Sequence, residues 1–294
     1  MASPRAGCCS LLAIAALLAL AVASPAQANR IAFYEGASAF SKATVSTVLP
    51  SGRGERRLTS PSVSSYSPAY TPDGRRIIYG SDPEGLGSPD LYSMSSSGER
   101  RRRITSTATG EAHPAVSPDG RSIAFVLRRE DRFEIARMTA GGRRVRVLTH
   151  LDAQTYEPAW SPDGRWITFS SDARGEPQIY TMRRNGSGLR RLTKSGSNSN
   201  PEYSPAGTRI VYTGVRGGDS EIYTMDAGTG GEVRQLSRNH VEDFEPTFSP
   251  DGRRVAFVSR GSGFNQVHVM TSAGKRRRQI THDRMHHFEP DWQP

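Results

Sequence analysis

A set of six residues that could form a binding site stands out because each residue directly precedes a proline. In chain order they are Ser67, His113, Glu157, Asn200, Glu245 and Glu289. Carboxylates that converge on a narrow space repel one another and raise their own pKa values unless a cation compensates them. Such hard oxygen ligands suit Ca²⁺, or a Lys or Arg side chain from a partner. We expect the polar floor of a partner-binding site to consist of Glu157, Asn200, Glu245, Glu289 and His113. The alternative is that each Glu bonds a backbone N–H of its own loop.

These residues occupy equivalent places in a sequence repeat. Turns of the type Ser-Pro-Asp-Gly start at intervals of 46, 44, 43 and 45 residues, at Thr71, Ser117, Ser161, Ser204 and Ser249. Pro, Asp and Gly each favour a tight turn. An apolar strand follows every turn, a third strand ends in Met, and a fourth ends at Thr or Ser. Four short strands in every 40–45 residues predict the blades of a propeller.

The two ends of the repeat region determine the number of blades. Residues 30–34 match a second strand with no first strand before them, and residues 288–292 match a first strand with nothing after them. Together they complete one blade. We therefore predict an all-β fold over residues 29–294: a six-bladed β-propeller of four-stranded antiparallel blades, closed by strands from both termini. An open array of six units would leave an exposed strand edge, which closure avoids.

The predicted topology places the six residues at the mouth of the central channel. In a propeller the chain crosses from the outer strand of one blade to the inner strand of the next on one face. The loops between second and third strands emerge on the same face, and here both sets vary in length and composition. Binding sites of repeat folds favour the face with variable loops.

The first 28 residues have the features of a secretory signal peptide. Arg5 precedes a short apolar run, and Ala26-Gln-Ala28 offers a cleavage site of small residues. Both cysteines, Cys8 and Cys9, precede that run, so we expect no lipid anchor and no disulfide or thiolate chemistry in the exported chain. No other apolar run is long enough for a membrane span. We expect a periplasmic or extracellular protein.

Arginine clusters and histidines are the other charged features. The clusters lie at 56–57, 100–103, 143–144, 190–191 and 275–278, each before or within the predicted outer strand of a blade. We interpret the arginine clusters as protection of the sheet edges, with contact to an anionic envelope polymer as the alternative, and we expect no nucleic acid partner.

Five histidines are expected on the crossings between blades. Two of them, His286 and His287, form the best local cluster, beside Glu289. They have no zinc-motif spacing, and we favour coincidence over a metal site. The other three histidines that we expect on these crossings are His150, His240 and His282.

The sequence contains no nucleophile elbow, phosphate-binding loop or dinucleotide fingerprint. We therefore expect a protein without enzymatic activity. The alternative is a metal-assisted lyase or hydrolase that acts on polysaccharide and uses the channel mouth.

The repeated unit Glu-Pro-x-Trp-Ser-Pro-Asp-Gly, followed by Ile-x-Phe-x-Ser, Ile-Tyr-x-Met and Arg-Leu-Thr, resembles the WD40-like repeat of the TolB-type six-bladed propellers. The resemblance spans residues 29–294. It implies a binding scaffold of the cell envelope, where TolB works in the Tol–Pal system. The α/β domain that precedes the TolB propeller has no counterpart before residue 29. The resemblance thus implies a monomeric, exported propeller that binds a protein or peptide partner.

Overall fold

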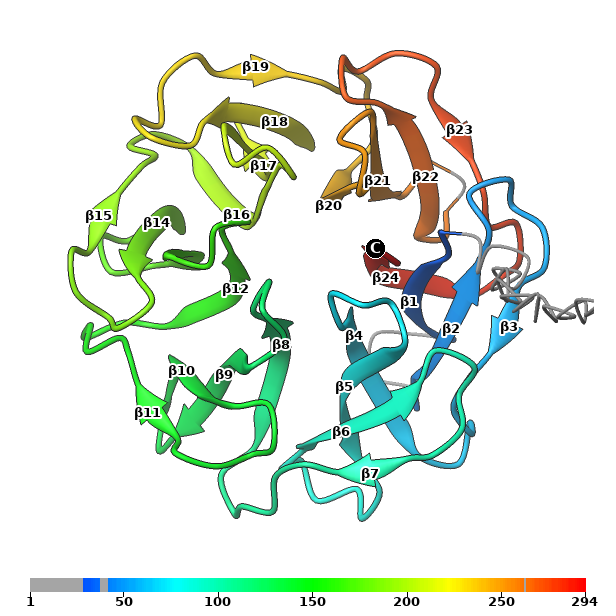
Figure 1. Ribbon diagram of the computed structural model, residues 1–294. Helices are drawn as coiled ribbons and strands as arrows, with labels where there is room; N and C mark the ends of the chain where they lie inside the picture. The colour runs from blue at the N-terminus through cyan, green and yellow to red at the C-terminus, as the bar shows by residue number, and fades with distance from the viewer. Residues whose placement is uncertain (1–28, 38–41, 262) are drawn as a thin grey trace, which may run out of the picture.

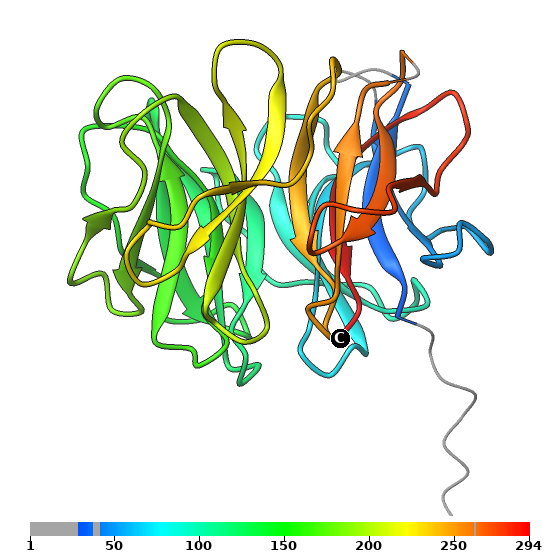
Figure 2. The same ribbon diagram turned by 90° about the horizontal axis from the view of Figure 1, so that it is seen from above.

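The computed structural model describes residues 29–37, 42–261 and 263–294, which form a ring of six four-stranded antiparallel sheets. Figure 1 shows the ring along its axis, and Figure 2 shows it from the side. The described residues contain 24 strands and no helix, which confirms the predicted six-bladed propeller. No helix in this part of the chain is therefore long and apolar enough to cross a membrane. The expected signal peptide, residues 1–28, lies outside the described residues.

In every blade the first strand lies at the channel and the fourth at the rim (Figure 1). The closing blade contains β24 (His286–Trp292), β1 (Ile31–Gly36), β2 (Thr44–Val48) and β3 (Arg56–Arg57). The next contains β4 (Ser64–Tyr70), β5 (Arg76–Asp82), β6 (Asp90–Ser95) and β7 (Arg102–Arg103). It is followed by β8 (Glu111–Val116), β9 (Ser122–Arg129), β10 (Arg132–Thr139) and β11 (Arg146–Val147).

The other three blades follow in chain order. The first contains β12 (Thr155–Trp160), β13 (Trp166–Ser171), β14 (Gln178–Arg183) and β15 (Arg190–Arg191). The second contains β16 (Ser197–Tyr203), β17 (Arg209–Val215), β18 (Ser220–Asp226) and β19 (Arg234–Gln235). The last contains β20 (Asp243–Phe248), β21 (Arg254–Ser259), β22 (Gln266–Thr271) and β23 (Arg278–Gln279).

The closing blade joins the two ends of the described chain. β24 pairs with β1 in an antiparallel register that sets Trp292 opposite Ile31 and His287 opposite Glu35. The N–H of Gln293 donates to the carbonyl of Arg30 at 2.7 Å, which extends the pairing beyond the strands. Ile31 and Trp292 are buried in one core cluster with residues of β21 and β22, so apolar contacts also join the closing blade to its neighbour.

The apolar core lies within and between the blades. The repeated methionines near the end of the third strand in five of the six blades are at most 2% exposed, as expected for packing residues; they are Met94, Met138, Met182, Met225 and Met270. Trp292 is buried as well, whereas Trp160 and Trp166 are only partly buried against their core clusters. The core is therefore a repeated element that fixes the relation of one blade to the next.

Arginines begin all six outer strands, which are only two residues long. These outer strands are distributed around the rim (Figure 1), so their arginines do not lie in one stripe. Neighbouring arginines also form ion pairs with buried acids: Arg57 with Glu35 at 3.3 Å, and Arg277 with Asp243 at 2.7 Å. Short, charged edge strands discourage pairing with another sheet.

The turns between first and second strands contain a hydrogen bond from the Ser or Thr hydroxyl to the Asp carboxylate. One turn has no Asp and lacks this bond. In the turn at Ser161 the hydroxyl donates to Asp163 at 2.5 Å, and the same carboxylate oxygen accepts the N–H of Arg165 at 3.0 Å. The hydroxyl bond is the main cause that lowers the pKa of Asp163. The turn at Ser204 has the exposed Ala206 at the Asp position.

We predict that Ala206→Asp stabilises the protein, because it supplies the missing acceptor in a turn that already has the right backbone. The expected gain at pH 7 is about 0.5–1.5 kcal/mol in the free energy of unfolding, measured by urea denaturation. An Asp with a lowered folded pKa stabilises above its unfolded pKa, so the gain should disappear as the pH falls below about 3.9. No gain at pH 7 would contradict this account of the turn.

Candidate functional site

The channel residues predicted from the sequence do converge. The residue before each inner-strand proline lies in the wall of one cavity of about 130 Å³, formed by all six innermost strands. These residues are Ser67, His113, Glu157, Asn200, Glu245 and Glu289. Each is the third or fourth residue of its strand, counted from the crossing that precedes it.

The backbone aims these side chains at the axis through a β-bulge. In β12 the register with β13 shifts between Tyr156 and Ala159, so Glu157 and Pro158 together face Phe169. All six residues before the prolines have a left-handed backbone, with φ between 47° and 56°. This conformation is costly for residues other than glycine and persists only where the surroundings enforce it. Bulges commonly re-aim a side chain beside a functional site.

Several channel side chains bind the backbone of the next blade. Oε2 of Glu157 accepts the N–H of Asn200 at 2.7 Å, and Oε2 of Glu245 accepts the N–H of Glu289 at 2.6 Å. Between them, the hydroxyl of Thr213 accepts the N–H of Glu245 at 3.0 Å and donates to Oδ1 of Asn200 at 3.2 Å. The alternative that each Glu bonds its own loop is therefore wrong: the acceptors reach across to the neighbouring blade.

Glu289 differs from the other channel glutamates. Among the described residues its carboxylate bonds no backbone N–H, and its Oε1 lies 3.6 Å from Nδ1 of His113. Both side chains are accessible from the channel, with 21% and 29% of their surface exposed. Oε1 of Glu157 and of Glu245 makes no hydrogen bond within the described part of the chain. The wall thus presents carboxylate oxygens that can still bind a ligand.

A second layer of acids lies two residues farther along the inner strands, and the sequence analysis missed it. Oε1 of Glu202 accepts the N–H of Phe248 at 3.1 Å, and Oδ2 of Asp291 accepts the N–H of Tyr70 at 2.6 Å. Three other blades have alanine at this position, namely Ala69, Ala115 and Ala159. A carboxylate at a repeat position that is alanine in three blades and Thr247 in another was the available signal.

The channel wall is rich in carboxyl groups, and His113, which lies 3.6 Å from Glu289, is the only side chain among its described lining residues that can carry a positive charge. Among the described residues that line the cavity there is no Lys or Arg. Burial raises the pKa of Glu157, and burial together with the charge of Glu289 raises that of Glu245 well above its usual range. Burial, with the charge of Asp291 added, raises the pKa of Glu202 to about 8. These shifts mean that ionised carboxylates in this channel favour a bound cation.

The histidines are arranged differently from the expectation. His286 and His287 lie within β24 and not on a crossing, which corrects the sequence analysis. The bulge in β24 consists of Glu289 and Pro290, which together face Phe33, whereas His287 pairs with Glu35. Glu289 contacts His113 across the channel, while Nε2 of His287 lies 3.5 Å from Glu35. The predicted cluster of His286, His287 and Glu289 is therefore not formed as one site.

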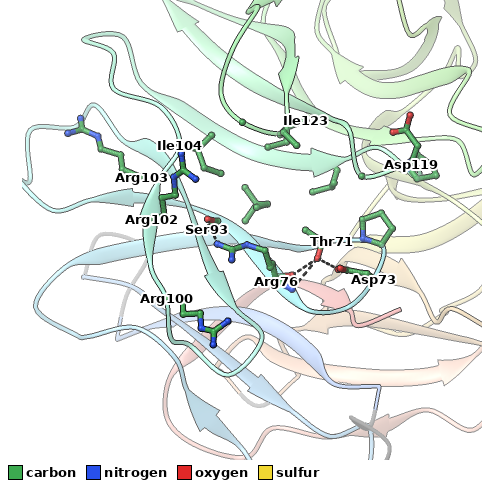
Figure 3. Close-up of a pocket in the computed structure, with 17 residues that line it drawn as sticks. Thr71, Asp73, Arg76, Ser93, Arg100, Arg102, Arg103, Ile104, Asp119 and Ile123 are labelled. Atoms are coloured by element: carbon green, nitrogen blue, oxygen red, sulfur yellow. Dashed lines mark hydrogen bonds between the residues drawn. The ribbon is translucent and has the colours of Figure 1, made fainter. Parts of the chain in front are cut away.

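A larger cavity lies away from the channel, between blades β4–β7 and β8–β11. Figure 3 shows Arg76, Arg100, Arg102 and Arg103 beside this space of about 700 Å³. A space of about 810 Å³ between blades β12–β15 and β16–β19 is lined by residues at the matching repeat positions, including Ser161, Trp166 and Arg190. Because the groove recurs between other blades, we interpret it as a product of the repeat.

We predict that Glu202→Gln stabilises the protein at high pH. The folded Glu202 keeps its proton up to about pH 8, whereas in the unfolded chain it ionises near pH 4.3, so the wild type loses stability as the pH rises between these values. The stability advantage of the variant over the wild type should be small at pH 5 and larger by roughly 4 kcal/mol at pH 9 in urea denaturation, since three pH units separate pH 5 from the folded pKa. The exposed Glu99→Gln is the control. Equal stabilities at pH 9 would show that water screens the channel.

Comparison with known proteins agrees with the fold. The model of PD40, the TolB beta propeller domain, matches residues 41–154, 100–213 and 193–294. TolB from Acinetobacter baumannii is similar in structure, with a TM-score of 0.79 and 28% identity over 90% of this chain and 67% of that one. Putative TolB from Agrobacterium tumefaciens has a TM-score of 0.70 and 24% identity over 86% and 89% of the two chains, which supports the fold alone. A search of curated proteins found no match. The chain belongs to the family of the TolB beta propeller domain.

Proposed function

We propose that the protein is an exported scaffold that binds a protein or peptide partner through the channel, where a cationic group of the partner contacts Glu157, Glu245 and Glu289. Asn200 and His113 complete the polar floor. The observation that carries the proposal is the concentration of carboxylates, without a lining Lys or Arg, in a chain whose net charge is +10. A buried ion pair is favourable only where its charges find good partners, and these carboxylates are already positioned.

The size and rigidity of the cavity favour a narrow cationic ligand. A space of about 130 Å³ suits a lysine side chain, an arginine side chain or the amino end of a peptide better than a folded surface. The wall is held by hydrogen bonds between blades, such as that of Glu157 with Asn200, so little ordering would be required on binding. The variable loops around the mouth would contact the rest of the partner.

The proposed location is the cell envelope. It is supported by the expected signal peptide at residues 1–28 and by the similarity to TolB proteins. The arginine rim could add contact with an anionic envelope polymer, and that contribution would weaken with salt. The channel contact, in a partly buried site, would be less sensitive to salt.

Enzymatic action on polysaccharide has no observation in its favour. Among the described residues the cavity wall holds one histidine, His113, which lies 3.6 Å from Glu289. A metal bound by several histidines would need more such ligands in the wall. A bound Ca²⁺ remains compatible with the carboxylate oxygens and is an outcome of the experiment below.

We predict that Glu289→Gln weakens partner binding about tenfold or more, because it removes the channel charge that bonds no backbone N–H. Wild type and variant would be used to capture partners from envelope extract, and the affinity of the captured partner would then be measured for both. Glu99→Gln, an exposed acid away from the channel, should bind like the wild type.

The same binding measurement with and without a chelator distinguishes a cationic group of the partner from a bound Ca²⁺. Binding that persists in chelator indicates a Lys, Arg or amino group of the partner. Binding that is lost in chelator and restored by Ca²⁺ indicates a bridging calcium ion. Unchanged affinity of Glu289→Gln would contradict a role for the channel.

A further inference from the structure

Four potential metal ligands meet where the closing blade joins the two ends of the described chain. Glu35 lies in β1, Glu55 directly before β3, Asp283 on the crossing before β24, and His287 in β24. One ligand atom from each of them lies within 4.8 Å of the ligand atoms of the other three. This cluster is separate from the channel, whose lining includes none of these four residues.

His287 is the buried member of the cluster and its side chain is aimed into it. The residue is fully buried, and its ring packs edge-on against Phe33 with centroids 4.9 Å apart. Nδ1 lies 3.1 Å from the carbonyl oxygen of Asn265, so this nitrogen carries a proton and donates it. Nε2 has no hydrogen-bond partner within the described chain, although it lies 3.5 Å from both Oε2 of Glu35 and Oδ1 of Asp283. A nitrogen lone pair facing two carboxylates is unfavourable unless a cation lies between them.

Hydrogen bonds from neighbouring side chains hold Glu35 and the loop of Asp283 in place. Oε1 of Glu35 accepts hydrogen bonds from Ser46 at 2.6 Å and Arg57 at 3.3 Å, which leaves Oε2 directed at His287. The loop that carries Asp283 is fixed by Gln266, whose Nε2 donates to the carbonyls of Asp283 and Met285. Metal ligands are commonly oriented by such second interactions, including a histidine N–H donated to a backbone carbonyl.

The repeat supplies an internal comparison. In blade β20–β23 the positions of His287, Glu35 and Glu55 are occupied by Asp243, Ser259 and Arg277. There the guanidinium of Arg277 binds both Asp243 and Ser259, so a side chain supplies the positive charge. In the closing blade the position of Arg277 is taken by Glu55, which reverses the charge. Besides Arg57 beside Glu35, the positive charge therefore has to come from a proton on His287 or from a bound ion.

We propose that Nε2 of His287 and carboxylate oxygens of Glu35, Asp283 and Glu55 bind a divalent transition-metal ion, with Zn²⁺ as the best fit. One imidazole and three carboxylates form the four-coordinate N/O ligand set that Zn²⁺ accepts, and imidazole disfavours Ca²⁺ and Mg²⁺. With a neutral His287, the three carboxylates and the nearby Arg57 leave two negative charges, which one divalent ion balances. The ion would bridge β1 and β24, the strand pair that closes the ring.

A proton on Nε2 of His287 is the competing occupant. Burial opposes a charged ring, but the Asp283 and Glu35 carboxylates, each 3.5 Å from Nε2, outweigh it and raise the pKa of His287 to about 9. Arg57 and Glu55 are the other charged groups around the cluster. The number of zinc ions bound per chain distinguishes a proton from a metal ion at Nε2, because a site closed by the protonated His287 would bind no zinc.

The test measures zinc bound to the full chain after treatment with chelator and dialysis against Zn²⁺, using elemental analysis. The wild type should retain about one zinc ion per chain, and its melting temperature should rise with zinc, since an ion that binds only the closed ring stabilises it. Glu55→Gln changes an exposed residue, so it should fold, and it should bind zinc at least tenfold more weakly. His287→Gln should lose stoichiometric zinc, whereas the exposed His282→Gln should retain it.

Glu55→Arg is the sharpest variant, because it recreates the arrangement of Arg277 in blade β20–β23. It should abolish zinc binding and make the melting temperature insensitive to chelator. If the wild type binds no stoichiometric zinc, or if Glu55→Arg binds it as well as the wild type does, the proposal is wrong. Loss of zinc in Glu55→Arg together with its retention in His282→Gln would support it.

Discussion

The antiparallel pairing of β24 with β1 is the contact on which the other features of the ring depend. It completes the sixth blade from the two ends of the described chain, and only a closed ring directs all six inner strands at one axis. β24 is also tied to the next blade, because Asp291 accepts the N–H of Tyr70 and Gln293 donates to the carbonyl of Gly74. Loss of this pairing would expose two strand edges and disperse the residues that line the channel.

Within the closed ring, the channel carboxylates have a structural and an electrostatic role. One oxygen of Glu157 and one of Glu245 satisfy a backbone N–H of the next blade, and the other oxygen is left for the channel. The arrangement has a cost, since six left-handed residues and several acids with raised pKa values lie close together. Strain and unbalanced charge of this kind are typical of sites that recognise a ligand. We therefore propose that the channel recognises the partner, while the β24–β1 pair closes the ring.

The sequence was sufficient to predict the blade number, the closure and the five polar residues of the channel, because repeat positions translate directly into positions around the ring. It did not show that Glu157 bonds Asn200, since the hydrogen bond joins different repeats. Glu202 lies two residues beyond the position before proline, so the pattern of residues before proline does not include it. The contact of His287 with Glu35 joins opposite ends of the described chain, so no local pattern predicts it. Patterns within one repeat predict local geometry; contacts between distant repeats require the folded ring.

The central claim is that the channel holds buried carboxyl groups whose ionised forms favour a bound cation. ¹³C NMR titration of the glutamate side-chain carboxyl groups, assigned by single Glu→Gln variants, tests it most directly. The account predicts that Glu202 titrates near pH 8, that Glu245 titrates well above the usual range, and that a lysine-containing peptide bound in the channel lowers both values. Titration of all channel glutamates near 4.3, the usual value for Glu, with no response to such a peptide, would contradict it.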